Sequence, residues 1–334
     1  MILNTFALAS LFVDVISLLL IVAAVFSALC FIRQMRRIEN LDEKSRAQDR
    51  LHLSYLFLST AFLIRLASWP LFYLLLHSLI PVVPGAMCIY GVTRVMPAFV
   101  TLLQILKPLA FFLIGGWLIL YRLDLSLKTR SLVKEGARFL IVVSVVAVLD
   151  NLAEFVFVFG FSPPGVAVSC CTAVADIVVP SAPLRPLAFF DARHLQILLA
   201  CFFGFSLGSI ALTGLLLMRK SITNTSRSLL FLLALLATMN VASTYGAYRE
   251  YWGPRLMNLP DHHCLYCLLQ YRPTSIFILG VFILGSFSAI WPLLLNFFAA
   301  SDEAAERLSQ FTRKLLKWSF VCLAASLAAT IGFV

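Results

Sequence analysis

Long apolar stretches alternate with short polar connections along the whole chain. A helix needs about 20 mostly apolar residues to cross the hydrocarbon core of a bilayer, and each stretch is near or above that length. Helices are the expected form, because a backbone surrounded by lipid must make its hydrogen bonds within its own segment. We therefore predict an all-α polytopic membrane helix bundle with short loops, in one domain covering residues 1–334. The eight predicted transmembrane spans are roughly 5–32, 52–80, 95–121, 139–161, 194–218, 228–249, 273–299 and 317–334.

The composition agrees with a membrane protein, since 61% of the 334 residues are hydrophobic and only 13% are charged. A soluble domain is about a quarter charged. The net charge of +10 could indicate binding to nucleic acid. Here, however, the basic residues lie in short segments between apolar stretches and form no basic domain. We expect the lipid bilayer as a partner and no nucleic acid.

Lysine and arginine are unequally shared between alternate connections. Of the 26 such residues, eighteen fall near the connections after the first, third, fifth and seventh spans, and six in the opposite connections. Because basic connections stay in the cytoplasm, this bias orients the chain. An even number of spans then places both termini outward. We predict an integral protein of a bacterial inner membrane, with the cysteine-bearing connections on the periplasmic side.

Five of the eight cysteines occupy those outward connections, and no cytoplasmic connection has a cysteine in its interior. Loops that formed independently would not need this segregation, so we predict that the outward cysteines converge on one site. They are Cys88, the vicinal pair Cys170 and Cys171, and the C-x-x-C formed by Cys264 and Cys267.

The C-x-x-C spacing lets two sulfurs bind one metal ion or form one disulfide. His262 and His263 directly precede Cys264, so two imidazoles are available beside the thiols. Thiolates with imidazole suit copper(I), zinc or an iron–sulfur cluster. Neighbouring cysteines such as Cys170 and Cys171 bond each other only with strain, which favours separate partners or a labile redox role. Structural disulfides, thiol–disulfide electron transfer and soft-metal binding all remain open interpretations.

This cysteine arrangement resembles that of the quinone-linked membrane enzymes that generate disulfides, including the vitamin K epoxide reductases. Those enzymes place a C-x-x-C at the outer end of a helix and a second cysteine pair in another outer loop. The resemblance covers Cys264, Cys267 and the pair Cys170 and Cys171. It does not extend to the architecture, because those enzymes have a core of four or five helices and about eight are predicted here.

Five charged residues fall well inside predicted spans: Asp14, Arg65, Lys107, Asp150 and Glu154. An unpaired charge at that depth costs several kcal/mol, so we expect these side chains to face the bundle interior and pair with one another. Asp150 and Glu154 are four residues apart and share one helix face. Three acids against two bases leave a net charge of −1. The set fits either a packing network or a path for protons, ions or a polar substrate.

The leading function hypothesis is thiol–disulfide electron transfer at the outward face, linked to a membrane quinone. In that scheme Cys264 and Cys267 form the membrane-proximal couple, and Cys88 or the vicinal pair meets a periplasmic thiol protein. One alternative is a soft-metal binding or transport protein, served by metal-carrying proteins, that uses the same five cysteines with His262 and His263. Another is a structural subunit that joins other membrane subunits and has disulfides within its loops.

Overall fold

The computed structural model describes residues 4–35, 55–127, 132–168, 192–219, 227–259, 261–298 and 302–332. Within these ranges the chain is helical, with turns and short irregular connections and no strand. The predicted all-α class is therefore confirmed. Cys170 and Cys171 lie outside the described residues.

Eight helices in the described part of the chain are long and apolar enough to cross a membrane. This number agrees with the number of spans predicted from the sequence. Several spans differ in extent from the prediction, the sixth and the eighth most, because hydropathy detects only the apolar part of a helix that continues past it. The spans are Thr5–Phe31, Tyr55–Val82, Pro97–Leu125, Val133–Gly160, His194–Met218, Arg227–Met257, Thr274–Phe298 and Arg307–Gly332.

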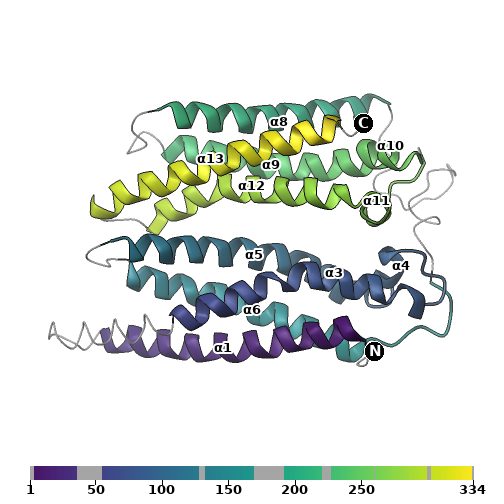
Figure 1. The fold of residues 1–334 in the computed structure, drawn as a ribbon, viewed down its shortest axis with the longest axis horizontal. Helices are drawn as coiled ribbons and strands as arrows, with labels where there is room; N and C mark the ends of the chain where they lie inside the picture. Colours follow the sequence, from purple (N-terminus) through teal and green to yellow (C-terminus); the bar gives the residue numbers. More distant parts are fainter. Residues whose placement is uncertain are drawn as a thin grey trace. The chain divides into compact units, whose positions relative to one another are not determined.

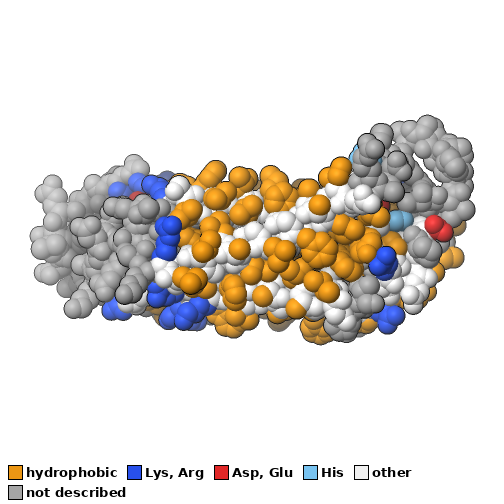
Figure 2. All heavy atoms as spheres, turned by 90° about the horizontal axis from the view of Figure 1, so that it is seen from above, with side chains coloured by type: hydrophobic (Ala, Val, Ile, Leu, Met, Phe, Trp, Pro, Cys, Tyr) orange, Lys and Arg blue, Asp and Glu red, His pale blue; other side chains and the backbone are white. Residues whose placement is uncertain are grey.

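Apolar side chains point outward from these helices, the reverse of the pattern in a soluble bundle. The first helix, α1 (Thr5–Met35), exposes Phe12 and Phe26 at 67% and 70% of their surface. It buries Asp14 and Ser17 completely. Figure 2 shows the same pattern on one face of the molecule, where hydrophobic side chains cover the middle of the helices and Lys and Arg lie toward their ends. Lipid is the medium that such a surface fits.

The chain divides into two compact units, Met1–Val168 and Ser169–Val334, and each is described by itself. In unit 1, α1 contacts α3 and α6, while α5 contacts α6 and α3, so that four spans form a ring. The second span is interrupted at Ala67, because Pro70 has no N–H to bond the carbonyl of Leu66. The elements of unit 1 are α1, helical residues 55–66, α3 (Ser68–Ser78), η1 (Ile80–Val82), α4 (Ile89–Thr93), α5 (Pro97–Leu125) and α6 (Val133–Gly160).

Unit 2 repeats this plan. Here α8 contacts α9 and α13, and α12 contacts α9 and α13, which again closes a ring of four spans (Figure 1). Its core includes Leu216, Leu233, Ala289 and Leu316. In both units a connection that contains short helices joins the second span to the third. The elements of unit 2 are α8 (Ala192–Met218), α9 (Arg227–Ala247), the π-helical turn η3 (Tyr248–Trp252), α10 (Gly253–Met257), α11 (Leu265–Tyr271), α12 (Thr274–Phe298) and α13 (Asp302–Gly332).

Candidate functional sites

The interior of unit 1 contains a cluster of charged side chains, which we call the charged network: Asp14, Arg65, Lys107, Asp150 and Glu154. They come from α1, residues 55–66, α5 and α6, and none has more than 2% of its surface exposed. The five charges are paired with one another, as expected for charges inside membrane spans.

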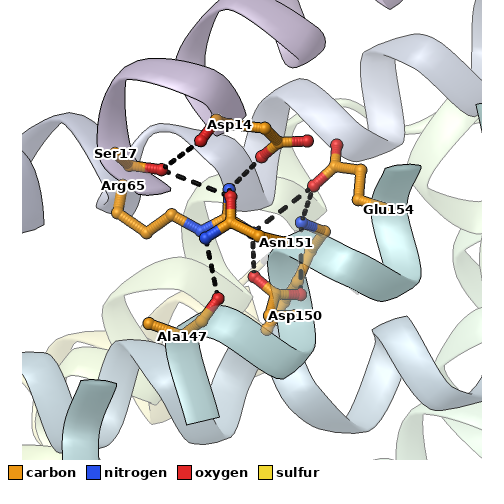
Figure 3. Close-up of polar contacts among 8 residues, drawn as sticks. Asp14, Ser17, Arg65, Ala147, Asp150, Asn151 and Glu154 are labelled. Atoms are coloured by element: carbon orange, nitrogen blue, oxygen red, sulfur yellow. Dashed lines mark hydrogen bonds and ion pairs between the residues drawn. The ribbon is translucent and has the colours of Figure 1, made fainter. Parts of the chain in front are cut away.

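Arg65 lies at the centre of the charged network (Figure 3). Its Nη1 donates to Oδ1 of Asp14 and, over 2.8 Å, to Oδ1 of Asn151. Its Nη2 donates to Oδ2 of Asp150 and lies 3.6 Å from Oε2 of Glu154. The planar guanidinium can contact partners on three sides because its donors are fixed in a fork. Arg65 therefore connects α1 to α6 through the second span.

Lys107 provides the second positive charge of the network. Its Nζ lies 2.5 Å from Oε2 of Glu154 and 3.5 Å from Oδ1 of Asp150. Both acids reach it because residues four apart stand on the same face of α6. The ammonium also lies 5.2 Å from the ring centroid of Phe72, which is completely buried. This contact is in the range of a cation–π interaction.

Two uncharged side chains support the network. Asn151 donates through Nδ2 to the carbonyl of Ala147 over 2.8 Å, which fixes its Oδ1 toward Arg65. Ser17 donates to the carbonyl of Asp14 at 3.1 Å and lies 3.3 Å from Oδ1 of Asn151. Ser17 was not among the predicted site residues, although its position three residues after Asp14 on a buried face was a usable signal.

The second candidate site is the C-x-x-C of unit 2. Cys264 is the N-cap residue of α11, and Cys267 lies in the first turn of that helix. Only 6% and 8% of their surfaces are exposed, and the two sulfur atoms lie within 4.8 Å of each other. This spacing suits two reactions: oxidation to a disulfide after a small movement, or capture of one soft metal ion.

The neighbouring histidines have other contacts. His263 Nδ1 lies 3.2 Å from Oε2 of Glu250 and 3.2 Å from the carbonyl oxygen of Arg249, both in η3. His262 is buried, and its backbone N–H donates to Leu259. Among the described residues of unit 2, no histidine or carboxylate joins both sulfurs in a group with ligand atoms 4.8 Å or less apart. Sequence analysis did not single out Glu250.

The other predicted thiols are placed as follows. Cys88 is the N-cap residue of α4 in unit 1 and is 2% exposed. Val168 is hydrogen-bonded to the loop before Cys88, because its N–H donates to the carbonyl of Pro84 over 2.9 Å. Gly85 allows this approach, since a side chain there would lie 2.8 Å from the carbonyl oxygen of Val168. The predicted convergence of all five cysteines stays a prediction.

Comparison with known proteins finds no match for the chain among protein-family models, curated proteins or solved structures.

Proposed function

We propose that the protein is an integral membrane thiol–disulfide electron-transfer protein with Cys264 and Cys267 as its membrane-proximal couple. The observation that carries the proposal is the pair of buried sulfurs within 4.8 Å of each other in the first turn of α11. This helix contacts α10, the last part of the span Arg227–Met257, and α12, which is the span Thr274–Phe298. Electrons leaving the couple would therefore start beside the bundle rather than in a distant loop.

The proposed acceptor is a membrane quinone. Two thiols lose two electrons and two protons as one S–S bond forms, and the quinone takes up both electrons and both protons to become a quinol. The couple returns to its reduced state when an external dithiol attacks the disulfide and is itself oxidised. The net reaction oxidises a substrate dithiol and reduces a quinone.

We propose that Cys88, or the vicinal pair Cys170 and Cys171, meets the substrate dithiol. Cys88 is the N-cap residue of α4 in unit 1.

A single-turnover experiment tests the proposal. The protein is reconstituted in nanodiscs, reduced, freed of reductant and mixed anaerobically with a short-chain quinone. We expect two thiols to disappear for each quinol formed. Cys264→Ser and Cys267→Ser should each leave the quinone unreduced, because neither variant can close the disulfide. Cys322→Ser, a buried cysteine on α13 of the same unit, is the matched control and should react like the wild type.

The alternative functions give different outcomes in the same samples. A soft-metal protein would contain stoichiometric copper, zinc or iron after purification and would lose it in the Cys264 and Cys267 variants, without forming quinol. A structural subunit would have thiols that neither quinone nor reductant changes. Either result would overturn the electron-transfer proposal.

We also propose the orientation that the basic connections indicate. In this orientation the connection that contains η1 and α4 and the connection that contains α11 are on the periplasmic side. Met87, between η1 and α4, is 71% exposed, and Met218, at the end of α8, is 83% exposed. In intact bacterial cells a membrane-impermeant thiol reagent should label Met87→Cys. Met218→Cys should be labelled only after the cells are permeabilised. The reverse pattern would show that the positive-inside bias does not orient this chain.

A further inference from the structure

Three carboxylate oxygens in the charged network lack a hydrogen-bond donor among the described residues: Oδ1 of Asp150, which lies 3.5 Å from Nζ of Lys107, and one oxygen each of Asp14 and Glu154. Oδ2 of Asp14 and Oε1 of Glu154 are fully buried and lack a hydrogen-bond partner in the described structure. Their sister oxygens are occupied, since Arg65 donates to Oδ1 of Asp14 and Lys107 donates to Oε2 of Glu154. In Figure 3 the two carboxyl groups point toward one another, and the charge of Glu154 acts on Asp14. A buried acceptor without a donor is destabilising, and more so when it is charged.

The charge count poses the same problem. With every group ionised, three carboxylates face one guanidinium and one ammonium, and the cluster has a net charge of −1. None of the five side chains is more than 2% exposed, so water does not offset this charge. An uncompensated charge inside a membrane span is costly. Within the described part of the chain, the cluster therefore lacks one positive charge, and the orphan oxygens of Asp14 and Glu154 lack a donor, while the buried Nε–H of Arg65 lacks an acceptor.

We propose that Asp14 and Glu154 form a proton-binding site in which one proton is shared between Oδ2 of Asp14 and Oε1 of Glu154. The carboxyl group that carries the proton donates a hydrogen bond to the orphan oxygen of the other carboxylate. The added proton also brings the net charge of the cluster to zero. It also removes the repulsion between the two carboxylates. Asp150 keeps its contacts with both Arg65 and Lys107.

The same geometry disfavours a metal ion. Calcium takes six to eight oxygen ligands, and magnesium requires a near-octahedral shell. The site offers two orphan oxygens, and the charged groups facing them from the second span, α5 and α6 are Arg65, Lys107 and Asp150. The positive charges of Arg65 and Lys107, which contact the same two carboxyl groups, repel a further cation. A proton needs only the two oxygens.

Such a site gives unit 1 a proton held in the middle of its spans. A small pocket beside the network is lined in part by Arg65, Ser68, Lys107 and Asp150. The inference does not depend on the thiol chemistry of unit 2, because no cysteine takes part in it.

Infrared spectroscopy of the reconstituted protein tests the proposal directly. The wild type should show the carbonyl stretch of a protonated carboxylic acid at neutral pH, shifted to lower frequency in D2O. Asp14→Asn and Glu154→Gln should each abolish this band. In either variant two carboxylates remain in the network, and the charges of Arg65 and Lys107 balance them without a further proton. Glu135→Gln is the matched control, since Glu135 is on α6 in a partly exposed pair with Arg138 and should leave the band unchanged. A wild type without the band, or a band that persists in both variants, would overturn the proposal.

The pH dependence of heat denaturation provides the second readout. If the native state holds one proton more than the unfolded chain, stability falls as pH rises. The Asp14→Asn or Glu154→Gln substitution introduces an amide that donates in place of the proton. Each variant should therefore fold and should lose this part of the pH dependence. A slope identical in wild type and variants, or stabilisation by sodium ions in place of protons, contradicts a shared proton.

Discussion

Replacing Arg65 by lysine should destabilise the protein by about 3–5 kcal/mol, the range for breaking a buried ion pair, although the charge is conserved. The two terminal nitrogens of Arg65 contact Asp14 and Asn151 on one side and Asp150 and Glu154 on the other. An ammonium is a compact point charge without a planar fork. It cannot occupy both positions, so Arg65→Lys leaves at least one carboxylate on α1 or α6 without its main donor.

The measurement is the free energy of unfolding in mild detergent, with helix content as the signal. Arg138→Lys is the matched control, because Arg138 also pairs with a carboxylate, Glu135, over 2.8 Å but is 55% exposed. Exposed pairs contribute about 0–1 kcal/mol, so this variant should be nearly neutral. Similar losses in both variants would mean that the buried fork of Arg65 has no special part in holding the ring together.

The fold class could be predicted from the sequence because the bilayer imposes a simple length rule on apolar segments. The rule is less accurate at helix ends. The sixth predicted span stops at residue 249, whereas the helical path continues through η3 and α10 to Met257. The last span starts ten residues earlier than predicted, at Arg307. Polar residues beyond the hydrocarbon core remain helical, and hydropathy gives no signal for them.

The similarity of the two units was not predictable from residue patterns. In unit 1 the polar interior consists of charged groups around Arg65. In unit 2 the corresponding interior is neutral: Ser206 donates to Asn240 over 2.8 Å, and the hydroxyls of Tyr248 and Thr330 lie 2.7 Å apart. Two interiors with different chemistry share no motif. What they share is the order in which the spans pack, which only the contacts between helices reveal.

The sites were predictable in identity but not in their pairings. Charges within spans had to be buried together, and the C-x-x-C spacing kept Cys264 and Cys267 close. That Arg65 would contact Asp14 depends on α1 lying beside the second span, which the sequence does not specify. The partner of His263 was hidden for a related reason. Glu250 precedes it by a loop and a short helix, and a π-helical turn determines where that carboxylate points.

The second large effect is expected at Lys107. Lys107→Met removes the cation that contacts both Glu154 and Asp150, so two carboxylates on α6 lose a donor at once. We expect a loss of about 3–5 kcal/mol. Asp150→Asn alone should also destabilise the protein, because Arg65 and Lys107 both lose a charged partner.

Combining Lys107→Met with Asp150→Asn removes one positive and one negative charge together. The double variant should be more stable than the sum of the single losses implies, by about 0.5–3 kcal/mol, the usual coupling between residues in contact. Unfolding free energies of the wild type, both single variants and the double variant measure this coupling. Lys107→Met combined with Asn240→Ala is the control, because Asn240 belongs to the neutral interior of unit 2, where Ser206 donates to it. Its losses should add. Strict additivity for Lys107 and Asp150 as well would show that the 3.5 Å approach between them does not act as an ion pair, and that Glu154 alone holds the ammonium inside the ring.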